Sequence, residues 1–98
     1  MTIEIKRDAE ATVIELEGRL DTTTAPALDK TISTDIEGTK NLVLDFKSLE
    51  YISSAGLRVL LGAQKKMQKI GSMKVINVRE EVMEVFEMTG FADILTIE

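Results

Sequence analysis

Two adjacent serines, Ser53 and Ser54, follow an apolar segment and stand directly before a stretch with the spacing of an amphipathic helix. The first N–H groups of a helix have no intrahelical partners and carry a partial positive charge, so a serine at this place can serve in two ways. Its hydroxyl can cap the helix, or it can be presented to a kinase as a phosphate acceptor. Both interpretations stay open, and they can hold together because the helix dipole would stabilise a phosphate there.

Two further residues belong to the same surface of the expected helix. Gly56 leaves its first turn without a side chain, which fits either the close approach of a partner or tight packing of the helix against a strand. Arg58 follows Ser54 by four residues and therefore lies near it on the helical surface. There it can contact a phosphate or an acidic partner, or remain an ordinary solvated arginine.

Asp21 and Asp45 are the carboxylates that could take part in chemistry, and each also fits a simple turn or cap. Neither has a partner at metal-ligand spacing, and the chain has no glycine-rich phosphate loop. The absence of Cys and His excludes a thiol nucleophile, a Cys/His zinc cluster and an imidazole base. We therefore expect no metal, no cofactor and no enzymatic activity, since an enzyme using these carboxylates and a serine would lack an evident base.

Length and charge bound the remaining possibilities. With 98 residues, the chain fits one domain spanning residues 1–98. A net charge of -5, from 17 acidic and 12 basic side chains, disfavours nucleic acid as a partner. The start of the chain lacks the apolar core of a secretory signal, and no apolar run approaches the roughly 20 residues of a membrane helix. These features predict a cytoplasmic protein that does not insert into membranes.

Hydrophobic periodicity predicts strands that alternate with helices. The expected strands cover residues 2–6, 13–17, 41–46 and 73–78, with at most a short final strand at 95–97, and the expected helices cover residues 24–36, 54–70 and 80–89. The short segment between the first two strands suits a hairpin. The unbroken apolar run Leu42, Val43 and Leu44 is typical of a central parallel strand buried on both faces.

The segments combine into an α/β fold with a mixed, mainly parallel sheet of four to five strands and helices packed against it. In the longest expected helix, residues 54–70, the spacing of apolar residues predicts which face is buried. We expect Leu57, Leu60, Leu61, Met67 and Ile70 to point inward, and Arg58, Gln64, Lys65, Gln68 and Lys69 to point mostly outward. Lys65, Lys66 and Lys69 complement the negative end of the helix dipole, which accounts for the basic cluster without a nucleic acid.

The segment YISSAGLRVLL, residues 51–61, resembles the phosphorylation motif of STAS domains of the anti-sigma factor antagonist (anti-anti-sigma factor) type. The resemblance extends in order over nearly the whole chain, to GRLDTTTAPAL at 18–28, LVLDF at 42–46 and GFADIL at 90–95. It implies a single STAS-like domain. It also implies a small cytoplasmic switch of bacterial partner-switching systems. We expect a monomer or weak dimer in the free state.

In that family, the unphosphorylated antagonist binds an anti-sigma factor that is also a serine protein kinase, and the sigma factor is released. Phosphorylation of a serine ends the binding, and a serine phosphatase restores it. Carried over by position, the acceptor is Ser54. Ser53 is a competing hydroxyl, since it takes the place where the family often has an acidic residue. The resemblance implies partner contacts at Asp21, Ser53, Ser54, Gly56, Leu57 and Arg58.

An alternative function uses the same face without phosphorylation. In this alternative, the chain is a STAS adaptor subunit of a larger signalling or transport assembly. Ala55 replaces a second hydroxyl residue that often follows the family's acceptor. The intact mass after incubation with kinases separates the two functions, because an adaptor gains no phosphate.

Overall fold

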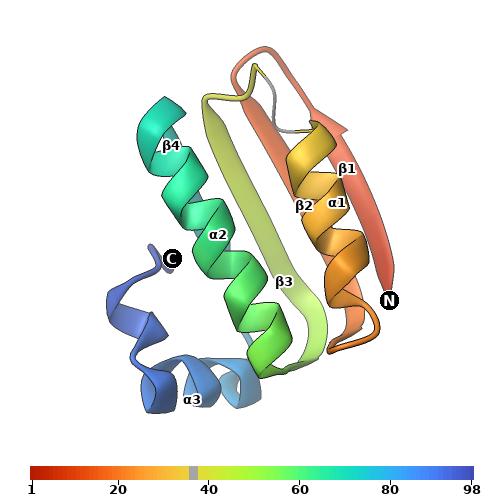
Figure 1. Ribbon diagram of the computed structural model, residues 1–98, viewed down its shortest axis with the longest axis vertical. Helices are drawn as coiled ribbons and strands as arrows, with labels where there is room; N and C mark the ends of the chain where they lie inside the picture. Colours follow the sequence, from red (N-terminus) through yellow and green to blue (C-terminus); the bar gives the residue numbers. More distant parts are fainter. Residues whose placement is uncertain (36–37) are drawn as a thin grey trace.

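The computed structural model describes residues 1–35 and 38–98 of the chain. Its elements follow the order expected from the sequence (Figure 1). The strands are β1 Thr2–Arg7, β2 Ala11–Leu20, β3 Asn41–Ile52 and β4 Ser72–Ile76; the helices are α1 Ala25–Asp35, α2 Ser54–Ile70 and α3 Glu80–Thr89, followed by the 3-10 turn η1 Phe91–Asp93. The bounds predicted for the second and third helices are confirmed, whereas the expected end of the first at residue 36 lies outside the described residues.

The strands of the described chain form one mixed sheet in the order β1-β2-β3-β4. β1 runs antiparallel to β2, whereas β2, β3 and β4 are parallel neighbours. α1 and α2 lie side by side over one face of this sheet (Figure 1). The α/β class with a mainly parallel sheet is thereby confirmed, and the sheet of the described part has four strands.

The predicted hairpin joins β1 to β2 and is held by Asp8. The side chain of Asp8 accepts hydrogen bonds from the backbone N–H groups of Glu10 and Ala11, both at 2.8 Å. These two bonds favour the ionised carboxylate and lower the pKa of Asp8. The Asp8 carboxylate thus provides hydrogen-bond acceptors for two backbone N–H groups of the turn that reverses the chain.

β3 is twice as long as predicted. Instead of a polar turn after residue 46, the strand continues to Ile52, and β2 continues beside it to Leu20. Two register shifts explain the difference, because each inserts an extra β3 residue opposite β2. Leu49 and Ile52 therefore return to the buried face at a spacing of three, which a search for strict alternation does not recognise as a strand.

The face of α2 that packs on the sheet differs from the prediction at two positions. Gln64 is only 7% exposed, because it continues the helical stripe of Leu57, Leu60 and Met67. Ile70 is 52% exposed, since it is the last residue of the helix, where the chain turns into β4. The predicted outward position of Gln64 and inward position of Ile70 were therefore wrong.

The end of the chain closes the core beside β4. α3 packs through Phe86, whose ring lies 6.3 Å from that of Phe46 on β3, measured between centroids. Leu95 is buried, and Ile97 forms a single parallel bridge with Val75 in place of a full fifth strand. No helix among the described residues is long and apolar enough to cross a membrane.

Candidate functional site

The carboxyl ends of β2 and β3 lie side by side at one end of the sheet, where α1 and α2 begin (Figure 1). The two strands are parallel neighbours, and their last residues, Leu20 and Ile52, are paired. The next residue, Ser53, donates its N–H to the carbonyl oxygen of Leu20 at 2.9 Å. The fold thus brings Asp21 beside the start of α2, although the two lie far apart in the sequence.

Ser53 and Ser54, at this end of the sheet, occupy different positions relative to α2. Ser53 has an extended backbone and is the N-cap of α2, and its Oγ accepts a hydrogen bond from the N–H of Gly56 at 3.4 Å. Ser54 is the first residue of the helix and is exposed. Within the described part of the chain, no hydrogen-bond partner of the Ser54 hydroxyl is found. Capping and display, the two roles left open by the sequence, are thereby divided between neighbouring residues.

Asp21 forms the turn that leads into α1. Its Oδ1 accepts hydrogen bonds from the hydroxyl and the N–H of Thr23, at 2.7 and 3.0 Å, and from the N–H of Thr24 at 3.2 Å. In return, the N–H of Asp21 donates to Thr24 Oγ1 at 2.8 Å. The bonds to the carboxylate, first of all that from the Thr23 hydroxyl, lower the pKa of Asp21 and favour its ionised form. The turn role is thus established by geometry, whereas a partner contact of Asp21 stays a prediction.

Gly56 and Leu57 are both buried in the chain's own fold. A Cβ at Gly56 would lie 2.7 Å from Leu20 Cγ and 2.9 Å from Ile52 Cγ1, distances that real Cβ atoms do not reach. Leu57 is 6% exposed and belongs to the core. Of the two interpretations of Gly56, the structure therefore supports packing of the helix against the strands. Both residues hold α2 in place, and their contacts with a partner stay a prediction.

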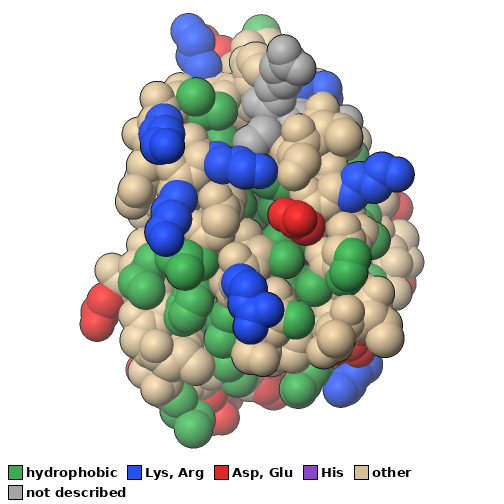
Figure 2. All heavy atoms as spheres, viewed as in Figure 1, with side chains coloured by type: hydrophobic (Ala, Val, Ile, Leu, Met, Phe, Trp, Pro, Cys, Tyr) green, Lys and Arg blue, Asp and Glu red, His purple; other side chains and the backbone are tan. Residues whose placement is uncertain are grey.

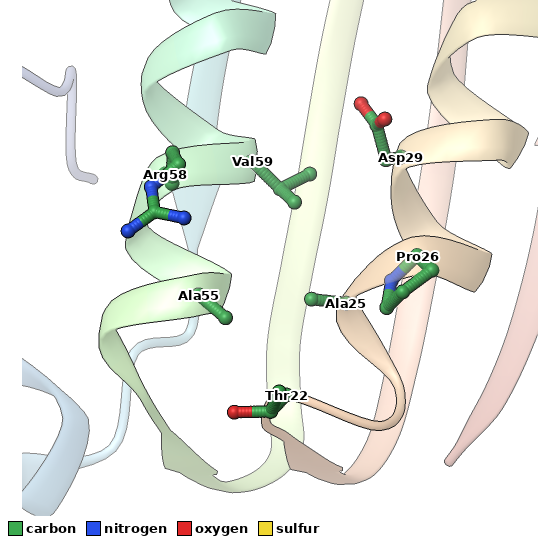
Figure 3. A pocket seen from close by; sticks show the side chains of 7 residues that line it. All are labelled: Thr22, Ala25, Pro26, Asp29, Ala55, Arg58 and Val59. Carbon is green, nitrogen blue, oxygen red and sulfur yellow. The ribbon is translucent and has the colours of Figure 1, made fainter.

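An open groove of about 310 Å³ lies between the first turns of α1 and α2 (Figure 3). Its lining residues are Thr22, Ala25, Pro26, Asp29, Ala55, Arg58 and Val59. In Figure 3, Val59 and Ala55 point from α2 toward α1, and the guanidinium of Arg58 points back along α2 toward its first turn. The groove is thus apolar at its centre, with one charge of each sign on its two walls.

Sequence reasoning identified Arg58 in this groove and missed the rest of its lining. Ala55 and Val59 are four residues apart and share one face of α2, which is a signal that was present in the sequence. The same holds for Ala25 and Asp29 on α1. What the sequence did not contain is that these two faces meet.

Basic side chains gather over the two helices, although the chain has a net charge of -5 (Figure 2). α2 contains no acidic residue, and its basic residues are Arg58, Lys65, Lys66 and Lys69. Lys66 reaches across to α1, where its Nζ lies 3.3 Å from Ser33 Oγ. The three lysines belong to the second half of α2, so Arg58 is the basic residue of this helix that lies near Ser54. A phosphate on Ser54 would add strong negative charge to this end of the helix.

Asp45 lies apart from the serines, on the opposite face of the sheet from the helices. Its Oδ1 accepts hydrogen bonds from the N–H of Lys47 at 3.0 Å and from Asn77 Nδ2 at 3.1 Å. The structure thus separates Asp45 from Asp21. Within the described residues, no group of three or more His, Cys, Asp or Glu side chains could hold a metal ion.

A family model described as the STAS domain matches residues 2–98 of the chain. The chain is 29% identical over 98 residues to the anti-sigma-B factor antagonist of Bacillus subtilis, which covers 99% of this chain and 90% of the relative. It is 30% identical over 101 residues to the anti-sigma-B factor antagonist of Listeria monocytogenes, which covers 100% of this chain and 89% of the relative. Both relatives are named as antagonists, that is, as regulators rather than enzymes.

Two solved structures of the anti-sigma factor antagonist SpoIIAA have a similar fold. The unphosphorylated form has a TM-score of 0.85 at 23% identity and covers 99% of this chain and 88% of that chain. The phosphorylated form, from Bacillus, has a TM-score of 0.77 at 22% identity and covers 99% of this chain and 91% of that chain. At these identities the likeness is one of fold.

Proposed function

This chain belongs to the STAS domain family, within the anti-sigma factor antagonist group, and from that membership we propose that it is an antagonist controlled by phosphorylation of Ser54. In the cytoplasm, the unphosphorylated chain binds an anti-sigma factor that is also a serine kinase, and the sigma factor is set free. Transfer of a phosphate to Ser54 ends the binding. A serine phosphatase returns the chain to its binding form.

The observation that carries this proposal is the division of roles between the two serines. Ser53 uses its Oγ to cap α2, while Ser54 stands exposed on the first turn. A phosphate on Ser54 would lie at the positive end of the helix dipole, where no acidic side chain of the first turn opposes it. The modified chain therefore keeps its fold, and only its surface changes.

Dissociation follows from the charge of the phosphate. Phosphorylation adds about -1.5 to -2 charges at neutral pH. The adjoining groove is apolar at its centre, where Ala55 and Val59 offer a partner close packing. Burying part of a phosphate charge against such a surface costs more than a few well-packed contacts contribute. Arg58 would in addition turn to the phosphate and be withdrawn from the partner.

The test begins with capture of partners from the native cytosol by the wild-type chain and by Ser54→Asp. We expect the wild type to retain a serine kinase that the Asp variant loses. The purified kinase and ATP are then added to complexes of the wild type, Ser53→Ala and Ser54→Ala. The wild type and Ser53→Ala should each gain one phosphate by intact mass and dissociate, whereas Ser54→Ala should gain none and stay bound.

Two outcomes would contradict the proposal in different ways. If Ser54→Ala is released and Ser53→Ala is not, the acceptor is Ser53. If no variant gains a phosphate and Ser54→Asp captures the same proteins as the wild type, the chain acts as an unmodified adaptor in a larger assembly.

A further inference from the structure

β1 is one edge of the sheet, and no other described strand pairs with its outer side (Figure 1). The hairpin shows which backbone groups face outward. The N–H of Asp8 donates to the carbonyl oxygen of Ala11 at 3.0 Å, and inward-facing and outward-facing residues alternate along an antiparallel ladder. Ile5, three residues before Asp8, therefore turns its N–H and C=O away from β2. Such an edge is where another strand can add.

The side chains of this edge have an unusual distribution of charge. Glu4 stands directly opposite Glu15 of β2, a pair of like charges. Lys6 Nζ contacts Glu15 Oε1 at 2.8 Å, so Glu15 has a cation beside it. Glu4, however, has no ion-pair partner among the described residues. On the opposite face of the strand, Ile5 is 38% exposed.

We propose that β1 pairs antiparallel with β1 of a second copy of this chain, about a two-fold axis at Ile5. In this register, Ile5 lies opposite the partner's Ile5, and the outward backbone groups of the two residues bond to each other. Glu4 lies opposite the partner's Lys6, and Lys6 lies opposite the partner's Glu4. The edge is thus complementary to itself, and each Glu4 gains a direct ion pair, whereas within its own chain it acts on Lys6 only from a distance.

The neighbouring symmetric registers are disfavoured by the same charges. A shift of the axis to Glu4 places the two Glu4 side chains opposite each other, and a shift to Lys6 does the same with two lysines. The axis at Ile5 is therefore selected. It extends the four described strands of each copy into one continuous sheet.

The pairing has a consequence for binding. β1 is separated from β3 and α2 by β2, so the first turn of α2 stays uncovered in both copies. A dimer would thus present two Ser54 surfaces at once. Since one short strand pair buries little surface, the dimer should be weak and depend on protein concentration.

Sedimentation equilibrium of the full chain tests the proposal with a charge exchange. One variant carries Glu4→Lys, which makes its edge wholly basic. The other carries Lys6→Glu together with Glu15→Lys. Its edge is acidic, and the ion pair between positions 6 and 15 is kept with its charges reversed. We expect each variant alone to dimerise at least about tenfold more weakly than the wild type, since like charges face each other twice. An equimolar mixture of the two should form a heterodimer, because every pair across the edge is then of opposite charge.

Two controls keep the result interpretable. Lys74→Glu, on β4 at the other side of the sheet, should leave the association unchanged. Ile5→Lys should abolish the association, because it places two lysines opposite each other at the two-fold axis while Glu4 and Lys6 are unchanged. Thermal unfolding of each variant verifies that it is folded. A wild type that stays monomeric at millimolar concentration, a mixture that does not associate, or single variants that dimerise like the wild type would overturn the proposal.

Discussion

Gly56 in the first turn of α2 lies against the side chain of Leu20 at the end of β2, so closely that a Cβ at Gly56 would stand 2.7 Å from Leu20 Cγ. Leu20 is fully buried, and Ile52 crowds the same position from β3. This contact determines how near the helix comes to the sheet. It therefore also determines where Ser53 and Ser54 are held.

Gly56→Ala should lower the free energy of unfolding by about 1–2 kcal/mol. Forcing an extra methyl into a packed core costs about 1–3 kcal/mol, and the better helix propensity of alanine returns about 1 kcal/mol or less. Gly62 is the matched control, since it lies in the same helix with open space around it. Gly62→Ala should stabilise the chain in urea denaturation. A Gly56→Ala chain as stable as the Gly62 variant would show that Leu20 and Ile52 yield freely.

The cap of α2 gives a second prediction. Ser53→Ala removes the acceptor for the N–H of Gly56 and should cost about 1 kcal/mol of stability, as for other helix caps. Ser54→Ala removes an exposed hydroxyl and should change stability by less than about 0.5 kcal/mol. Denaturant unfolding of both variants separates the two serines. Equal losses would mean that the capping role is shared between them.

Gln64 is a polar residue within the buried face of α2, and its Oε1 has no hydrogen-bond partner in the described structure. Burying an unsatisfied amide oxygen is unfavourable, so Gln64→Leu should raise the free energy of unfolding by about 1 kcal/mol. Gln68→Leu, at an exposed position of the same helix, should change it little. A loss of stability in the Gln64 variant would indicate that the amide has a role in packing that leucine cannot fill.

Asp21 should make the start of α1 sensitive to acid. Its pKa is lowered in the folded chain, chiefly by the hydroxyl of Thr23. A group whose folded pKa lies below the unfolded value stabilises the fold above the unfolded pKa, and this stabilisation is lost as pH falls through the folded pKa. The wild type should therefore be more stable than Asp21→Asn at neutral pH, and the difference should shrink below about pH 4. Urea denaturation of both chains from pH 7 to pH 3 measures it, and a constant difference would exclude the carboxylate as its source.

Much of the fold could be predicted because its signals are local. The helices at 54–70 and 80–89 follow from apolar residues at helical spacing, and the hairpin follows from a short polar segment between two alternating strands. The length of β3 could not be predicted in this way. The strand continues through two register shifts, each with one more residue on β3 than on β2. Such a bulge is defined by the strand that it faces, so it cannot be recognised from β3 alone.

The candidate site shows the same division. Ser54, Arg58 and Asp21 could be selected from the sequence, because residue type and position relative to a helix start are visible there. Ser54 as the phosphate acceptor stays a prediction. The groove lined by Ala55 and Val59 was not found, because small apolar residues carry no chemical signal of their own.

By itself, the amino-acid sequence determined the class of fold, the helix that begins at the two serines, and the lack of His and Cys for catalysis. Only the tertiary structure decided which serine caps and which is displayed, why Gly56 is a glycine, and that Asp21 lies beside Ser53. The reason is physical. Periodicity and capping act within a few residues of chain, whereas the approach of α2 to β2 is set by contacts between segments that meet only when the sheet has formed.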